Sequence, residues 1–487
     1  MYTWIPLKSS ADLAELNNQL TPEYDPANVA KKLADGLSDA IKAVLIECNY
    51  IDKDYRSTYY NFYSKKGQFY RPDCVRLHLF DETVKFDQKA LKLHCADEQL
   101  DHHYFGFIVL RPTGIATIGR SVVSPDVRSE PGSHVITTNH KVHLLGYKLT
   151  VQGFPSMDQH IDISVCAHVA CWSILRHYSE RYSIYREFLT HDITMMAQEF
   201  NPGGLVPSNG LKVSHAERVF QEAGTFPLLI ARVGDNDSSF YRQLHSYVES
   251  GFPLFAAMHG RNHAIAIVGY EWRTPAGATP TTVMRYAWDE VKSLVAVDDN
   301  YLPYLSIPSH GGADNSSYSC DDIDAFIVAL PEKVFYPADA VDKLSETLFR
   351  LGPGLGLPLK DESILRYFIT TGSALRHFMR ERESEFDRNL LETVMSLPFA
   401  QFVWIVEVAT AADWAIGQIS ARAILDATAS LREVTPFWLI HSRTNALIFN
   451  RSTVGDTMNS VRALALSGMS NTAFTRWDKN LRPTQSK

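Results

Sequence analysis

Three strand-like segments in the middle of the chain limit the folds that are open to it. Apolar residues alternate or run together in FPLFAAM, NHAIAIVGYEW and SLVAVDD, which lie within residues 252–299. Short apolar runs of this kind, bounded by polar and turn residues, are typical of β-strands. Upstream, VCAHVACWSILRHYSERY has helical spacing and contains neither Gly nor Pro. The middle of the chain therefore predicts helix first and sheet second.

The length of 487 residues predicts several structural units, since domains usually hold about 100–200 residues. Apolar residues make up 45% of the chain, which is enough for well-formed cores. We expect an N-terminal α/β unit over 1–150, a central unit over 151–335 and a C-terminal α/β unit over 336–487.

Both outer units show helix and strand patterns. The first predicts helix from about Ala11 to Ala43, followed by strands at Val75–Phe80 and Tyr104–Pro112. The last predicts one long charged helix around Ser373–Met395 and a strand at Phe402–Ala409. Each unit is therefore expected to combine a sheet with helices.

Charge and cysteine content point away from several classes of protein. The formal charge is −8 and no basic run is present, so nucleic acid is not an expected partner. The first residues lack a signal-peptide pattern, and no stretch is long and apolar enough for a membrane span. The six cysteines form no CxxC pair and suggest free thiols in a reducing, cytoplasmic setting. They are Cys48, Cys74, Cys95, Cys166, Cys171 and Cys320.

Cys166 has the setting of a nucleophile. If Ser164 is the N-cap of the helix, Cys166 lies in the first turn, where unpaired backbone N–H groups favour a thiolate. The same amides could hold an oxyanion. Gln159 lies seven residues upstream, in MDQHIDISVC, and its side-chain amide could complete that oxyanion hole.

The base and its partner are expected from the sheet. His263 opens the alternating segment NHAIAIVGY, where a side chain can face a cleft. Asp298 ends SLVAVDD and could accept a hydrogen bond from the imidazole, which would fix its tautomer. Asp299 is the alternative third residue. Because neighbouring residues of a strand point to opposite faces, only one of the two carboxylates is expected to reach the ring.

The order of Gln159, Cys166, His263 and Asp298 resembles the papain-like cysteine peptidase superfamily, including the bacteriocin-processing peptidase domains of transporters. The segment NHAIAIVGY is the closest match, since papain-type enzymes carry a similar His-Ala-x-x-x-Val-Gly-Tyr strand. The resemblance covers roughly residues 151–330. It implies an α+β fold in which a helical subdomain bearing the cysteine packs on an antiparallel β subdomain bearing the histidine.

The chain also departs from that family. Ala167 follows the cysteine where papain-type enzymes usually have glycine beside it, and Asp298 replaces the usual Asn, as in the bacteriocin-processing group. The interval of 35 residues from His263 to Asp298 is longer than usual. RTPAGATPTT and the strand after it are therefore expected to form an extra hairpin in the β subdomain.

Cys171 is the rival nucleophile, because it is followed by Trp172 as in papain itself. It lies twelve residues from Gln159 and inside the helix, where cysteine is usually a small core residue. A metal site in CAHVAC is disfavoured, since residues five apart on a helix point about 140° away from each other. His168, His177, His191 and His259 are expected to be structural or exposed.

These observations predict an enzyme that hydrolyses a protein or peptide substrate through an acyl-enzyme, without a metal or organic cofactor. Two alternatives remain open. Transglutaminases and arylamine acetyltransferases use the same Cys, His, Asp order for acyl transfer, with an amine in place of water. The other alternative is a protease fold that has lost catalysis and serves as a binding scaffold. The flanking units are expected to recognise the substrate or control access to the cleft.

Overall fold

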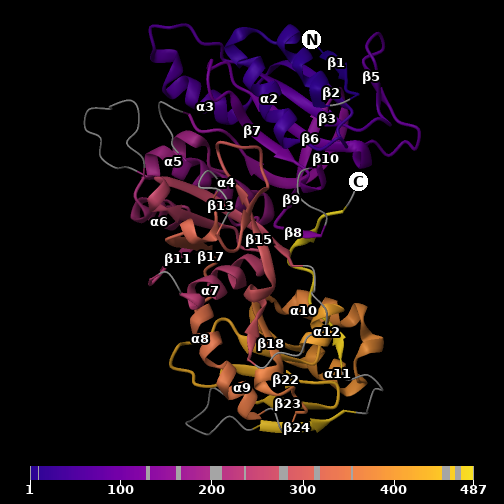
Figure 1. The fold of residues 1–487 in the computed structure, drawn as a ribbon, viewed down its shortest axis with the longest axis vertical. Coiled ribbons are helices and arrows are strands. Elements are labelled where there is room, and N and C mark those ends of the chain that lie inside the picture. Colours follow the sequence, from indigo (N-terminus) through magenta and orange to yellow (C-terminus); the bar gives the residue numbers. More distant parts are fainter. Residues whose placement is uncertain are drawn as a thin grey trace.

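The computed structural model has a mixed α+β architecture with three antiparallel sheets stacked along its long axis (Figure 1). The N-terminal sheet lies at one end, the central sheet follows, and the C-terminal sheet lies at the other end. No described helix is long and apolar enough to cross a membrane. The structure describes residues 2–8, 10–127, 132–160, 166–197, 211–234, 237–273, 283–311, 318–351, 355–451, 461–466 and 473–485.

The N-terminal sheet has the order β1-β2-β3-β6-β7-β10-β9, and all its pairs are antiparallel. Its strands are β1 (Tyr2–Pro6), β2 (Ala43–Tyr50), β3 (Cys74–Phe80), β6 (Tyr104–Leu110), β7 (Ile118–Val123), β9 (Thr138–Leu144) and β10 (Tyr147–Ser156). The short hairpin β4 (Lys85–Asp87) and β5 (Lys92–His94) stands apart from it. The helices are α1 (Leu16–Gln19), α2 (Pro26–Gly36) and α3 (Lys53–Asn61).

The helix expected over Ala11–Ala43 is wrong in extent. Pro22 and Pro26 each open a new helical segment, because proline fits the first turn of a helix and interrupts its interior. Ala43 already belongs to β2, whose first four residues are buried in the sheet. Burial of this apolar run against its neighbours outweighs its helical spacing. The strands expected at Val75–Phe80 and Tyr104–Pro112 are confirmed as β3 and β6.

The central sheet has the order β11-β17-β12-β13-β15-β16, again antiparallel. Its strands are β11 (Phe226–Ala231), β12 (Leu254–Met258), β13 (His263–Trp272), β15 (Val291–Val297), β16 (Leu305–Pro308) and β17 (Ala325–Leu330). Its helices are α4 (Cys166–Arg181), α5 (Thr190–Ala197), α6 (Val213–Glu222) and α7 (Ser238–Glu249). The predicted order of helix before sheet holds for β12, β13 and β15, whereas β11 precedes α7.

The C-terminal sheet has the order β14-β18-β19-β21-β22-β23-β24, with β14 and β18 as its parallel pair. Its strands are β14 (Arg285–Tyr286), β18 (Ser363–Thr371), β19 (Phe402–Thr410), β21 (Ala421–Asp426), β22 (Phe437–His441), β23 (Asn445–Phe449) and β24 (Val461–Ala465), beside the small pair β20 (Gln418–Ile419) and β25 (Phe474–Thr475). Its helices are α8 (Ala338–Lys343), α9 (Ser345–Leu351), α10 (Gly372–Glu381), α11 (Arg388–Ser396) and α12 (Ala411–Ala415).

Two expectations for this part of the chain are wrong. The long helix around Ser373–Met395 is two helices, because α10 ends at Glu381 and Asp387 caps a new helix by accepting a hydrogen bond from the Asn389 amide. The strand expected after RTPAGATPTT is only the two-residue β14, and it joins the C-terminal sheet instead of the central one. Residues 274–282, which hold most of the expected hairpin, lie outside the described residues.

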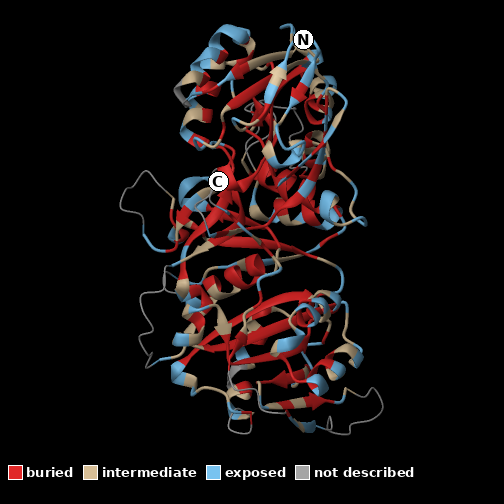
Figure 2. Ribbon diagram, turned by 90° about the vertical axis from the view of Figure 1, so that its right-hand side faces the viewer, coloured by how far each residue is buried: buried red, intermediate tan, exposed pale blue. Residues whose placement is uncertain are grey.

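The three sheets exchange segments across the expected unit boundaries. The strand β8 (Ser133–Val135) comes from the N-terminal part of the sequence but pairs with β13 of the central sheet. The C-terminal strand β26 (Arg482–Pro483) returns from the C-terminal tier to the central sheet and pairs with β8 (Figure 1). Buried residues run without a break from the central tier into the C-terminal one (Figure 2), where α7 contacts both β13 and β18.

Candidate active site

Cys166 is the first described residue of α4 and lies at the edge of the core. Every residue from Ala167 to Tyr178 is buried, whereas Cys166 itself is half-buried. The first turns of the helix that follow Cys166 are therefore packed on all sides. Ser164, the expected N-cap, lies outside the described residues.

A buried ion pair holds α4 against the N-terminal tier. Asp54 of α3 accepts hydrogen bonds from the Trp172 indole (2.9 Å) and from the Arg176 guanidinium (2.7 and 2.9 Å). The side chains of Asp54 and Arg176 are only 4% and 1% exposed. The N-terminal unit therefore contributes directly to the placement of the helix that carries Cys166.

His263 begins β13, directly after a tight turn from β12. Asn262 adopts a left-handed conformation with φ 49°, which asparagine tolerates better than most residues. The first pair of the hairpin then places His263 opposite Met258. On the other side, β13 pairs with β15, so the end of β15 brings Asp298 beside the ring.

The His263 ring joins Cys166 to Asp298. Its Nε2 lies 2.8 Å from Asp298 Oδ2, and Cys166 is near enough to the ring for its charge and hydrogen-bonding capacity to act on the pKa of His263. Burial disfavours the charged ring, but the hydrogen bonds and negative charges of Asp298 and Cys166 outweigh it and raise the pKa of His263 to about 10. Because Asp298 occupies Nε2, Nδ1 is the nitrogen left for the thiol. The arrangement favours an imidazolium beside sulfur.

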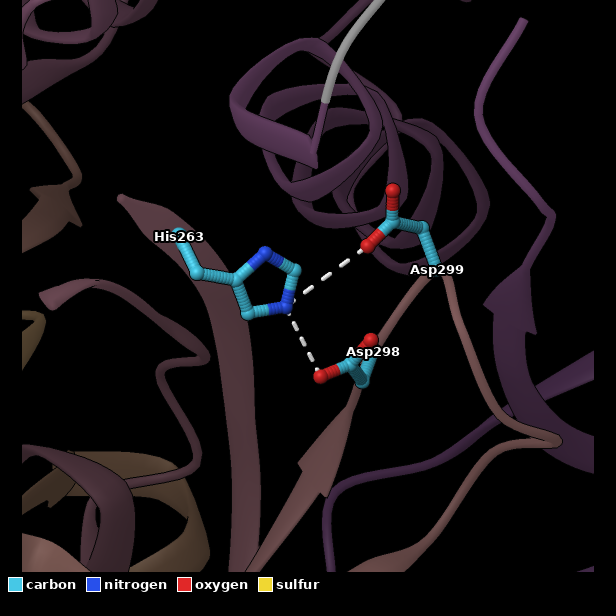
Figure 3. Close-up of side chains that lie close together, drawn as sticks. All are labelled: His263, Asp298 and Asp299. Atoms are coloured by element: carbon cyan, nitrogen blue, oxygen red, sulfur yellow. Dashed lines mark hydrogen bonds and ion pairs between the residues drawn. The ribbon is translucent and has the colours of Figure 1, made fainter. Parts of the chain in front are cut away.

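Asp299 also faces the imidazole, contrary to the expectation that only one carboxylate could. Its Oδ1 lies 3.7 Å from His263 Nε2, on the same side as Asp298 (Figure 3). The alternation of strand side chains does not apply here, because β15 ends at Val297 and the chain turns, with the Asn300 amide donating to Asp298 Oδ1. Burial and then the charge of Asp298 raise the pKa of Asp299 to about 7.

Three ligand atoms of His263, Asp298 and Asp299 lie within 4.8 Å of one another. An imidazole and two carboxylates are a donor set that divalent metal ions bind. This donor set could not be recognised in the sequence as a metal-binding motif, because two of the residues are adjacent and the third lies on another strand.

Tyr318 is a further contributor that sequence analysis did not identify. Its ring stacks on His263, with centroids 5.5 Å apart and an angle of 27° between the planes. Burial and then the charge of Asp298 raise the pKa of Tyr318 to about 12, so the phenol stays neutral. The ring covers one face of the His263 imidazole. No local pattern around Tyr318 marks this role, because the contact is made between distant parts of the chain.

A cavity of about 620 Å³ opens beside Cys166 and His263. This volume lies within the range of ordinary ligand sites. Besides Cys166 and His263, the wall is mainly apolar, with Lys212, Ser214, His259 and Asn262 as its polar members. The apolar residues come from α4, from α6 and its lead-in, and from β12 and β13: Ala167, Leu211, Val213, Phe255, Ala257, Met258 and Ala264.

Gln159, the expected oxyanion-hole residue, lies at the end of the N-terminal tier and is half-buried. The buried Arg111 guanidinium donates to the backbone carbonyls of Asp158 and Gln159, which fixes this part of the chain. Residues 161–165, which connect Gln159 to Cys166, lie outside the described residues. The oxyanion role of its side chain therefore stays a prediction.

Cys171 is fully buried, and burial raises the pKa of its thiol. His168 and His177 are buried on the same helix, where burial lowers the pKa of both, that of His168 to about 4. His259 is largely exposed and lies 3.6 Å from Asp324. Cys166 is thus the cysteine of α4 that both meets a histidine and reaches a cavity.

Comparisons with known proteins do not identify a family for this chain, so the function is inferred from the geometry of the site. No family model matches the chain. No curated protein matches it either.

Proposed function

We propose that this chain is a cysteine-nucleophile hydrolase of the papain-like kind and that its substrate is a protein or peptide. The observation that carries the proposal is the His263 ring, which lies close to Cys166, the first described residue of a buried helix, and to Asp298 at the end of the neighbouring strand. A helix packed on an antiparallel sheet with this division of residues also supports the papain-like resemblance.

The reaction follows from these positions. The Cys166 thiolate attacks the carbonyl carbon of an amide, and the helix amides together with the Gln159 side chain stabilise the oxyanion. The His263 imidazolium then donates its proton to the leaving amine. Water, deprotonated by His263, attacks the acyl-enzyme and releases the carboxylic acid and the free thiolate.

Asp298 and Tyr318 act through His263. Asp298 holds the ring in one orientation and stabilises its charged form, while Tyr318 covers one face of the ring. The apolar cavity beside Cys166 would receive an uncharged side chain of the substrate. Its size supports a peptide better than a very small acyl donor.

An electrophilic cysteine probe tests the proposal. Labelling of the full chain at neutral pH should be fast, should disappear in Cys166→Ala and should slow strongly in His263→Ala. Cys171→Ala is the matched control, because it removes the other cysteine of α4 and should leave labelling unchanged. Labelling that survives Cys166→Ala and disappears in Cys171→Ala would overturn the assignment.

Peptide cleavage is measured separately. A peptide library digested with the wild-type chain should acquire new amino termini, and the Cys166→Ala chain should produce none. Amine incorporation into the acyl product would instead indicate acyl transfer. Labelling of Cys166 without turnover of either kind would refute the hydrolase function.

A further inference from the structure

The Asp299 carboxylate is buried without the partners that such a group normally has. Its side chain is 1% exposed, and neither oxygen has a donor at ordinary hydrogen-bond geometry within the described part of the chain. The weaker interactions that act on it are those with Asp298 and with its own backbone amide. A buried carboxylate is costly unless it is paired, hydrogen-bonded or bound to a cation. The group that it faces is His263 Nε2, at 3.7 Å (Figure 3).

The geometry around this carboxylate fits a metal ion. Two ligands bound tetrahedrally at about 2.0–2.1 Å from one Zn²⁺ are about 3.3 Å apart. The distances from His263 Nε2 to the oxygens of Asp298 and Asp299 are 2.8 and 3.7 Å, which lie on either side of that value. All three ligand atoms lie within 4.8 Å of one another. Small side-chain rotations would therefore bring these three atoms to three of the four coordination positions of a tetrahedral Zn²⁺.

Charge and donor type indicate which ions are suited. Two carboxylates and a neutral imidazole carry two negative charges, which one divalent cation neutralises. The nitrogen ligand favours Zn²⁺ or a similar transition metal over Mg²⁺ and Ca²⁺, which prefer oxygen ligands alone. We infer that His263, Asp298 and Asp299 form a binding site for a divalent transition metal ion of the Zn²⁺ type.

The ion would turn off the chemistry proposed for Cys166, and this consequence rests on the proposed function. Binding replaces the proton on His263 Nε2, which is released to solvent, and draws Asp298 from the ring to the metal. A metal-bound imidazole loses the paired carboxylate and resists becoming an imidazolium at Nδ1. Cys166 then lacks the cation that stabilises its thiolate. The site is thus inhibitory and regulatory.

Direct binding of Zn²⁺ is the first test, and it does not depend on catalysis. Calorimetry on the full chain, after removal of metal with a chelator, should show one strong site in wild type and in Cys166→Ala. Asp299→Asn should weaken this site by at least roughly 10- to 100-fold, since that loss is already found when only a group that supports a metal ligand is removed. Asp426→Asn is the matched control, because it removes a buried carboxylate of the C-terminal tier instead.

A second variant and thermal unfolding separate loss of the metal site from misfolding, and a Co²⁺ spectrum identifies the ligands. His263→Ala should also abolish the site, and thermal unfolding should show that each variant is folded. Co²⁺ bound in place of Zn²⁺ should give no sulfur-to-cobalt charge-transfer band, since the ligand set contains no thiolate. Equal Zn²⁺ affinity in wild type and Asp299→Asn, or loss of the site in Cys166→Ala, would overturn the inference.

Inhibition is measured last. Zn²⁺ should slow electrophile labelling of Cys166, and a chelator should restore it. If metal-free Cys166 is unreactive while Zn²⁺ still binds as described, the hydrolase proposal fails and the metal site stands. If Cys166 is reactive and Zn²⁺ binds without slowing it, the inhibitory role is refuted.

Discussion

Removing the Asp54 carboxylate should uncouple the nucleophile helix from the N-terminal tier. Asp54→Ala leaves Glu187 as the remaining ion-pair partner of the buried Arg176 guanidinium among the described residues, and it leaves the Trp172 N–H without its acceptor. Breaking a buried ion pair from one side costs about 3–5 kcal/mol. Because Glu187 keeps part of the compensation, we expect the lower end, about 3 kcal/mol.

The ion pair itself is not expected to be a large source of net stability. Burial raises the pKa of Asp54 despite the adjacent Arg176, and burial lowers the pKa of Arg176. Both directions show that desolvation of the charges outweighs their attraction. The double variant Asp54→Ala with Arg176→Met should therefore be far less damaged than the sum of the two single variants.

Urea unfolding followed by tryptophan fluorescence measures this cycle. The coupling energy between the two positions should reach at least about 2 kcal/mol, within the range for residues of one network. Labelling of Cys166 gives a local readout, which should slow in Asp54→Ala even where the chain is folded. Single-variant losses that add to within about 0.5 kcal/mol would refute the reasoning.

Four more predictions concern His263, the ring that stacks on it and the strand that carries it. In the metal-free chain the His263 imidazolium, which donates the proton to the leaving amine, should persist up to pH of about 10, so peptide cleavage should fall only above that pH, and Asp298→Asn should move the fall to lower pH. Because the pKa of His263 is higher in the folded chain than in the unfolded chain, its protonation adds to the free energy of unfolding. This contribution is complete below pH of about 6.5 and is lost as pH rises to about 10, which urea unfolding at several pH values would measure. Tyr318→Ala should slow labelling by roughly 10- to 100-fold through loss of ring orientation, and Tyr318→Phe should restore it. Gly269→Ala should lower the free energy of unfolding by about 1–3 kcal/mol, because an added Cβ would lie 2.2 Å from the His134 carbonyl oxygen. An unchanged midpoint in thermal or urea unfolding would contradict this close approach.

Much of the central tier could be predicted from the sequence. The segments FPLFAAM, NHAIAIVGYEW and SLVAVDD correspond to β12, β13 and β15, since their apolar patterns and polar borders are local properties. The helix that follows Cys166 was likewise expected from its helical spacing. The meeting of His263 with Asp298 was expected from the family resemblance and from the order of the residues.

Other features depend on contacts between distant segments and could not be predicted locally. β8 and β26 are too short to give a strand signal, and each is held by pairing that only the assembled sheet offers. The stacking of Tyr318 on His263 is of the same kind. The Ala11–Ala43 helix failed for a related reason, because burial in the N-terminal sheet decides the conformation of its last residues.

The sequence by itself determined which side chains could do chemistry and on which type of element each lies, because alternation and helical spacing are set by neighbours along the chain. The tertiary structure decided which of them meet. Asp299 shows the difference: strand alternation turns it away from His263, but β15 ends at Val297 and the folded turn brings both carboxylates to one nitrogen. A contact of this kind depends on where a strand stops within the packed sheet, and that point is set by the surrounding core.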